Sequence, residues 1–187
     1  MKICLKKNGN TALTALYANI PDLISAIKVL KSFGTVANPI SINPFIDKEA
    51  AVPIPSLKGN ETLSIEIIPT NDPQLYSPKI IFIEIKNMDE QFNVNYCNGT
   101  NNETKWSDII DVGNYIPAPN ASLFIKSSSN DEYKIKFKKE KEATFISYNL
   151  VFSLELPIED NKPLQKCVFI LDPLIKIVSN PGSVNKK

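Results

Sequence analysis

Apolar and polar residues alternate along residues 143–156 of the chain. Every second residue of one register is apolar, and the set comprises Tyr148, Leu150, Phe152, Leu154 and Leu156. The residues between them are mostly polar, namely Ser147, Asn149, Val151, Ser153 and Glu155. A period of two places the two sets on opposite faces of a strand. The segment therefore predicts a long strand of an antiparallel sheet, with one buried face and one mostly solvated face.

Shorter segments with strand patterns follow one another after residue 59. They cover residues 62–68, 79–86, 91–96, 122–126, 132–139, 166–171 and 174–178. Turn-forming residues fill the links between them. Repeated short strands without helical patterns between them favour a sandwich or barrel. We therefore predict an all-β fold, an antiparallel β-sandwich over residues 59–180, followed by a frayed tail over residues 181–187.

The first 58 residues show a different pattern. Asn8-Gly9 separates two apolar segments, which predicts a hairpin because a type I′ turn needs positive φ at both central residues. The second arm of this hairpin, residues 11–17, is equally compatible with a helix. Four prolines interrupt residues 35–56, which predicts edge pieces or extended connections. We expect residues 1–58 to form a hairpin, a helix and a proline-rich arm packed on the main domain.

Residues 21–33 carry the one clear helical pattern. The apolar residues with helical spacing are Leu23, Ile24, Ile27 and Leu30. Pro21 and Asp22 suit a first turn, and Gly34 suits the left-handed position after the last turn. We expect the helix to pack on a sheet or across one end of the sandwich. The alternative is a helix that binds a partner.

Composition narrows the classes of function. The chain has 187 residues, 43% of them hydrophobic, and a net charge of +1, so no overall field attracts nucleic acid or an anionic membrane. No apolar segment reaches the roughly 20 residues of a membrane span, and no signal peptide is evident. We therefore expect a cytoplasmic protein, with secretion by another route left open. The three cysteines, Cys4, Cys97 and Cys167, are interpreted as reduced thiols, with one disulfide as the alternative.

The chain contains no histidine. This excludes Ser-His-Asp and Cys-His catalysis and most catalytic zinc sites. No glycine-rich phosphate loop is present either. We therefore expect a non-catalytic protein that needs no cofactor and no metal. An enzyme that uses carboxylates alone is the lowest-ranked alternative.

One segment combines acidic, amide and aromatic residues of the kind that bind sugars or calcium on loops. The candidate ligand-binding residues are Trp106, Asp108, Asp111, Asn114 and Tyr115. We interpret the segment as structural, with Trp106 filling one end of the sandwich of a non-catalytic binding or self-assembly protein. The alternative is a carbohydrate-binding, lectin-like module, with calcium as an optional aid.

Lysines occupy one face of the predicted strand over residues 132–139. Lys134, Lys136 and Lys138 alternate there with Tyr133 and Phe137, which belong to the opposite face. A surface that binds single-stranded nucleic acid needs basic and aromatic side chains on the same face. We therefore interpret the segment as an edge strand whose lysines discourage pairing with other sheets.

The C-terminal segment ends with a long strand, a polar turn, a second strand and the sequence Asp172-Pro173-Leu174-Ile175. Over roughly residues 62–179 it resembles a small bacterial β-sandwich family named for its DP-EP motif, and it is similar to the bacterial inclusion-body protein family. The resemblance implies a sandwich that acts by binding or self-association, with structural roles for Asp172 and Pro173. We expect the partner to be a protein, including a second copy, or a glycan.

Overall fold

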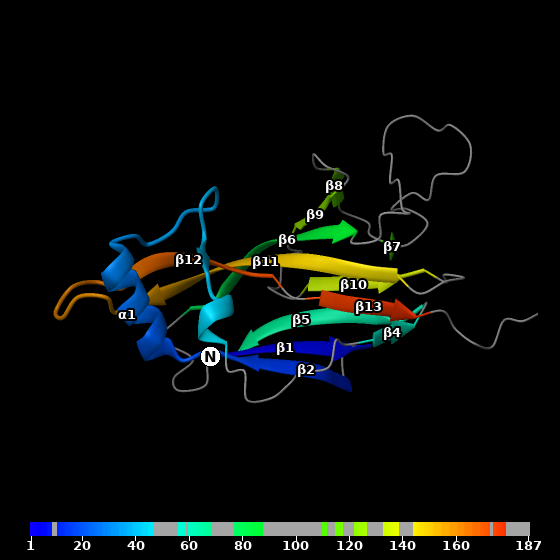
Figure 1. Ribbon diagram of the computed structural model, residues 1–187, viewed down its shortest axis with the longest axis horizontal. Coiled ribbons are helices and arrows are strands. Elements are labelled where there is room, and N and C mark those ends of the chain that lie inside the picture. The colour runs from blue at the N-terminus through cyan, green and yellow to red at the C-terminus, as the bar shows by residue number, and fades with distance from the viewer. Residues whose placement is uncertain are drawn as a thin grey trace, which may run out of the picture.

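The alternating segment forms β11 (Thr144–Leu156), the long central strand of the larger of two sheets in the computed structural model (Figure 1). The structure describes residues 1–8, 11–46, 56–58, 60–68, 77–87, 110–111, 115–117, 122–126, 133–138, 144–172 and 174–178. One side of β11 pairs with β6 (Lys79–Asn87). The other side pairs with β12 (Gln165–Leu171) along one part and with β13 (Leu174–Val178) along another. The 13 residues of β11 therefore accommodate two neighbours on one side.

Eight strands of the described residues form the larger sheet. Its main path runs β3-β12-β11-β6-β9-β8, and it includes β3 (Ile40–Ser41), β9 (Leu123–Lys126) and β8 (Tyr115–Pro117). β4 (Ser56–Lys58) extends it beside β13. The pairings β12–β3 and β13–β4 are parallel, and the other pairings are antiparallel.

In the part of the chain that the structure describes, the smaller sheet has five strands in the order β2-β1-β5-β10-β7. They are β2 (Thr11–Tyr17), β1 (Lys2–Lys7), β5 (Thr62–Ile68), β10 (Tyr133–Phe137) and β7 (Ile110–Asp111). β1 and β2 form the predicted antiparallel hairpin, and Asn8 takes a positive φ of 52°. The second arm is thus a strand, because pairing with β1 outweighs its helical propensity. β10 lies between β5 and β7, so our interpretation of it as an edge strand is wrong.

Apolar side chains of both sheets form one core. The smaller sheet contributes Ile3, Leu5, Leu63, Ile65, Tyr133, Ile135 and Phe137, and the larger sheet contributes Ile83, Ile85, Tyr148, Leu150, Phe152, Leu154 and Phe169. The Tyr133 hydroxyl donates a hydrogen bond of 3.0 Å to the Ile81 carbonyl and so links β10 to β6. The all-β class is confirmed by the two sheets and the single α-helix of the described chain. The face-to-face sandwich stays a prediction.

The other face of β11 is not solvated, which corrects our expectation. Ser147, Asn149, Val151 and Ser153 are only 5%, 7%, 1% and 3% exposed. β11 is flanked on both sides, and Val151 lies directly between Phe82 of β6 and Ile170 of β12. Short side chains on a central strand are covered by larger neighbours in this way. Glu155, near the end of β11, is exposed as predicted.

The predicted helix is α1 (Ile20–Leu30), and it ends three residues earlier than expected. Lys31 takes the left-handed conformation after the last turn, with φ 51°. Gly34 has a positive φ of 68°, but it serves a close backbone contact, since a Cβ atom there would lie 2.3 Å from the Val168 carbonyl oxygen. The Val168 N–H donates to the Phe33 carbonyl at 2.9 Å. The chain after α1 is therefore held against β12.

Residues 1–58 supply strands to both sheets. β1 and β2 belong to the smaller sheet, whereas β3 and β4 belong to the larger one. The short 3₁₀ helix η1 (Asn43–Phe45) lies between β3 and β4 in the chain. The boundary that we predicted near residue 58 thus falls between β4 and β5, which belong to different sheets.

With 11 residues, α1 is far shorter than the roughly 20 residues that a membrane-crossing helix needs. The described part of the chain contains no helix that is long and apolar enough for such a crossing.

Candidate functional site

The predicted ligand-binding residues are only partly placed. Trp106, Asp108 and Asn114 lie outside the described residues. Asp111 belongs to β7 of the smaller sheet, opposite Lys136, and Tyr115 belongs to β8 of the larger sheet, opposite Ile125. The backbones of the two described residues are thus on different sheets, and the glycan site stays a prediction.

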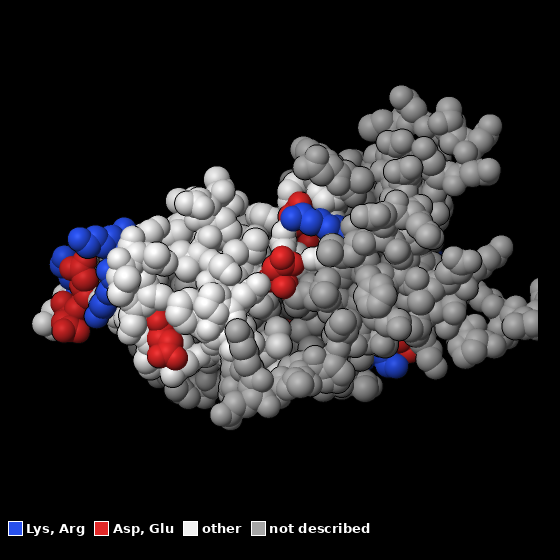
Figure 2. Space-filling view, in the orientation of Figure 1, with Lys and Arg blue, Asp and Glu red and all other residues white. Residues whose placement is uncertain are grey.

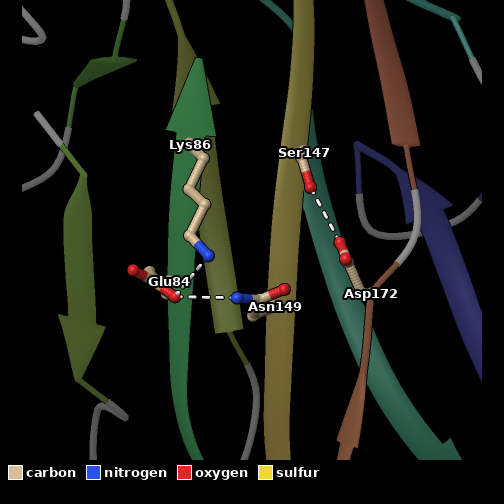
Figure 3. Close-up of polar contacts among 5 residues, drawn as sticks. All are labelled: Glu84, Lys86, Ser147, Asn149 and Asp172. Atoms are coloured by element: carbon tan, nitrogen blue, oxygen red, sulfur yellow. Dashed lines mark hydrogen bonds and ion pairs between the residues drawn. The ribbon is translucent and has the colours of Figure 1, made fainter. Parts of the chain in front are cut away.

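A row of polar side chains crosses the outer face of the larger sheet (Figure 3). We call it the polar row, and its members are Lys86, Glu84, Asn149, Ser147 and Asp172. Asn149 Nδ2 donates to Glu84 Oε2 at 2.7 Å, and Lys86 Nζ lies 3.3 Å from the same oxygen. Ser147 Oγ donates to Asp172 Oδ1 at 2.8 Å. Each pair joins β11 to a neighbouring segment, β6 on one side and the end of β12 on the other.

The contacts of the polar row are structural in character. A buried polar group without a hydrogen-bond partner costs free energy, and Asn149 and Ser147 are both buried. The Asp172 N–H also donates to Asn43 Oδ1 at 3.2 Å, which attaches η1 to the same edge. The side-chain partner of Asp172, Ser147, is 25 residues away in the sequence. Among the described residues, no group of three side chains could hold a metal ion.

Two titratable groups lie in the core of the larger sheet. Burial raises the pKa of the Cys167 thiol from 9.0 to about 11, so the thiol stays protonated near neutral pH. Burial also raises the pKa of Tyr148 well above 10.0, and its hydroxyl has no hydrogen-bond partner among the described residues. Cys4 and Cys167 are free, buried cysteines, whereas Cys97 lies outside the described residues. Protonated, inaccessible thiols are poor nucleophiles and metal ligands.

An apolar hollow lies between α1 and η1. We call it the α1 groove; its volume is about 490 Å³, and it is lined by Asp22, Ser25, Ala26, Val29, Leu30 and Phe45. Five of these residues come from one helix, where Asp22, Ala26 and Val29 follow the spacing that places side chains in one strip. Phe45 comes from η1 and closes the opposite side.

Apolar side chains at and beyond the groove are open to solvent. Val29, Leu30, Phe33 and Val36 are 81%, 58%, 41% and 51% exposed. Figure 2 shows a mostly uncharged surface over α1 and η1, with charged side chains at its left-hand margin and an acidic group over the lower end of α1. The exposure of Leu30 corrects our expectation that it belongs to the core-facing stripe of the helix. Exposed apolar side chains that gather in one place mark contact surfaces more often than isolated ones do.

The two sides of α1 explain why this surface exists. Ile20, Leu23 and Ile27 are buried and anchor the helix to the core. The strip from Asp22 to Val29 adjoins that buried face, so the apolar arc of the helix is wider than packing on the core requires. The adjacent pair Val29-Leu30, immediately after the anchoring residues, is the sequence signal that we missed. Phe45 gave no local signal, because only the fold brings η1 beside α1.

Charges at the two ends of α1 differ in sign. Asp22 lies in the first turn, Lys28 in the last turn and Lys31 just beyond it. All three are exposed, and none forms an ion pair with another described residue. These positions also suit the helix dipole, which favours acids at the first turn and bases at the last.

Comparison of the chain with protein-family models, with curated proteins and with solved structures found no match.

Proposed function

We propose that this protein is a non-catalytic binding protein whose contact surface is the α1 groove and its apolar margin. The observation that carries the proposal is the exposure of Val29, 81%, on the wall of an apolar hollow. Leaving a valine or leucine side chain in water forgoes roughly 1.5–3 kcal/mol relative to burying it. A partner that covers Val29 and Leu30 would recover part of that free energy.

The surface is preformed, which supports a binding role. Leu23 and Ile27 are 0% and 1% exposed, so the helix that carries the groove is fixed to the core. The Phe33 carbonyl accepts a hydrogen bond from the Val168 N–H, which holds the segment after α1 against β12. A rigid surface loses little conformational entropy on binding, so more of the contact energy appears as affinity.

The arrangement also resembles the anatomy of a protein interface. A mostly uncharged area over α1 and η1 is bordered by charged side chains (Figure 2). Protein interfaces commonly have an apolar centre and a polar rim, and specific ones bury at least about 1,000 Å² in total. The groove alone is too small for that area, but Phe33 and Val36, in the segment that follows α1, are also exposed apolar side chains. A protein partner therefore fits this surface better than a small ligand does.

Site-directed photo-cross-linking tests the proposal. A photoreactive amino acid replaces Val29 in one variant and Lys86, an exposed member of the polar row, in the control. We expect an adduct with a protein from the Val29 position, in the cells that make the protein or with the purified chain, and little or none from the Lys86 position. Equal yields at both positions, or no adduct at Val29, would contradict the proposed contact surface.

A further inference from the structure

We infer that the occupant of the α1 groove is a second copy of this chain, with the two α1 helices antiparallel across a two-fold axis. The inference rests on the proposed function and names its partner. A two-fold contact uses the same patch on both subunits, so the patch must be complementary to itself. The α1 surface meets this requirement in both charge and shape.

The charges of α1 are complementary to themselves in one orientation. The acidic end carries Asp22, and the basic end carries Lys28 and Lys31. Antiparallel copies bring the acidic end of each helix beside the basic end of the other, and they also oppose the two helix dipoles. Parallel copies would bring like charges together. All three side chains are exposed and form no ion pair within the described part of the chain, so they are available for this contact.

The shape of the strip fits a helix crossing. Ser25 and Ala26 lie at the middle of α1 and line the groove. Small side chains at a crossing point let two helices approach until their axes are about 8–10 Å apart, the usual distance between packed helices. A two-fold axis near Ser25 places Asp22 of one copy level with Lys28 of the other. Val29 and Leu30 of each copy then lie over the apolar surface of its mate.

Light scattering over a wide concentration range is the first test. The wild-type chain is expected to change from monomer to dimer as concentration rises. Val29→Glu places a charge in the apolar centre and is expected to remain monomeric, since burying an unpaired charge is unfavourable. Lys138→Glu, at an exposed position beyond β10, is the matched control and should associate as the wild type does. A wild-type chain that stays monomeric throughout overturns the inference.

A charge exchange tests the antiparallel orientation. Asp22→Lys alone, and Lys28→Asp with Lys31→Asp alone, each place like charges together twice in a homodimer. Each change is expected to raise the dimer dissociation constant about tenfold. An equimolar mixture of the two variants restores opposite charges at both contacts, so heterodimers should form as the wild-type dimer does. A mixture that associates no better than either variant overturns the antiparallel arrangement.

Two controls keep these outcomes interpretable. Far-UV circular dichroism and thermal unfolding show whether each variant is folded, and Asp22→Asn replaces Asp22→Lys where the reversal disturbs the helix. Raising the salt concentration should narrow the differences in dimer dissociation constant between the charge variants, because salt screens exposed charges at the rim of the contact.

The cross-linking and light-scattering results together separate this inference from the proposed function. If the chain is monomeric and position 29 forms an adduct with another protein, the second copy is overturned as the occupant, but the proposed function stands. Absence of both adduct and dimer would overturn both.

Discussion

The polar row and the α1 groove both lie outside the core shared by the two sheets, but they differ in what their side chains contact. In the polar row, Glu84 and Asp172 accept hydrogen bonds from Asn149 and Ser147. In the groove, Val29 and Leu30 contact mostly solvent. Charged and polar groups are usually the first place to look for function. In the polar row these groups bond one another, whereas in the groove the apolar side chains are left without a partner.

The difference teaches that whether a side chain already has a contact partner within the protein says more about its function than its residue type does. A polar network whose members bond one another fixes strand positions and has few groups left to offer a ligand. An exposed apolar wall on an anchored helix offers a surface whose burial is favourable as soon as a partner covers it. Substitutions should therefore separate the two regions, with stability changing in one and association in the other.

The largest effect is expected at the buried face of α1, because substitutions there should change both stability and association. Leu23→Ala removes a side chain that is 0% exposed beneath the groove. The loss of buried surface and the remaining cavity should lower the free energy of unfolding by about 2–5 kcal/mol. Association should weaken as well, because the helix loses its fixed position. Urea denaturation measures the first effect and light scattering the second. A loss below about 1 kcal/mol would show that α1 is not an integral part of the core.

A smaller effect is expected in the polar row. Glu84→Ala leaves the buried Asn149 amide without its acceptor, which should lower the free energy of unfolding by about 1–3 kcal/mol and leave association unchanged. Glu84→Gln keeps an oxygen acceptor and should lower the free energy of unfolding by less.

Val29→Ser is the opposite case: its free energy of unfolding should stay within about 0.5 kcal/mol of the wild type, while its dimer dissociation constant rises. If Glu84→Ala weakened association as strongly, the separation between the two regions would be lost.

The smallest effect is expected in the core, where alkaline pH should lower the free energy of unfolding through the buried Cys167 thiol. Burial raises the pKa of Cys167 from 9.0 to about 11, so the folded state holds the thiol proton more tightly than the unfolded chain does. The stability that this provides is fully present below pH 9 and is lost as the pH rises toward 11. We expect a loss of about 1 kcal/mol between pH 9 and pH 10.

Urea denaturation across this pH range measures the loss. Cys167→Ala is the matched control, because it removes the thiol and should flatten its share of the slope. The buried Tyr148 hydroxyl, whose pKa is raised well above 10.0, continues the loss at higher pH. An identical slope for wild type and Cys167→Ala would show that the thiol titrates alike in both states.

Alternation predicted the inner face of β11 correctly and its outer face wrongly. Tyr148, Leu150, Phe152, Leu154 and Leu156 are all buried, as expected. Alternation identifies the more apolar of two faces, but it does not show how deeply the other face is covered by neighbouring strands. Phe82 and Ile170, the neighbours of Val151, come from β6, much earlier in the chain, and from β12, the strand that follows β11. Asn149 and Ser147 lie opposite Glu84 and Lys86 of β6, a pairing that local sequence does not show.

The candidate site was predicted only in part. Helical spacing correctly placed Leu23 and Ile27 against the core. It could not show that Leu30 faces the opening, because α1 ends early, at Leu30, when Lys31 takes a left-handed conformation that glycine favours more strongly. Phe45 reaches the groove through the path of β3 and η1, which no local pattern encodes. The glycan residues were grouped by proximity in sequence, yet Asp111 and Tyr115 belong to separate sheets.

The central position of β11 has a consequence for the order in which the protein forms during translation. The ribosome makes the strands of the hairpin and β5 first, and these can pair with one another early. β6 emerges long before β11, which starts only at Thr144. At about 5–20 residues per second, β6 waits on the order of seconds for its main partner. Until then the edge of β6 that pairs with β11 has no partner, and an unpaired strand edge is open to wrong pairing, so the nascent chain is the state of this protein most in need of a chaperone.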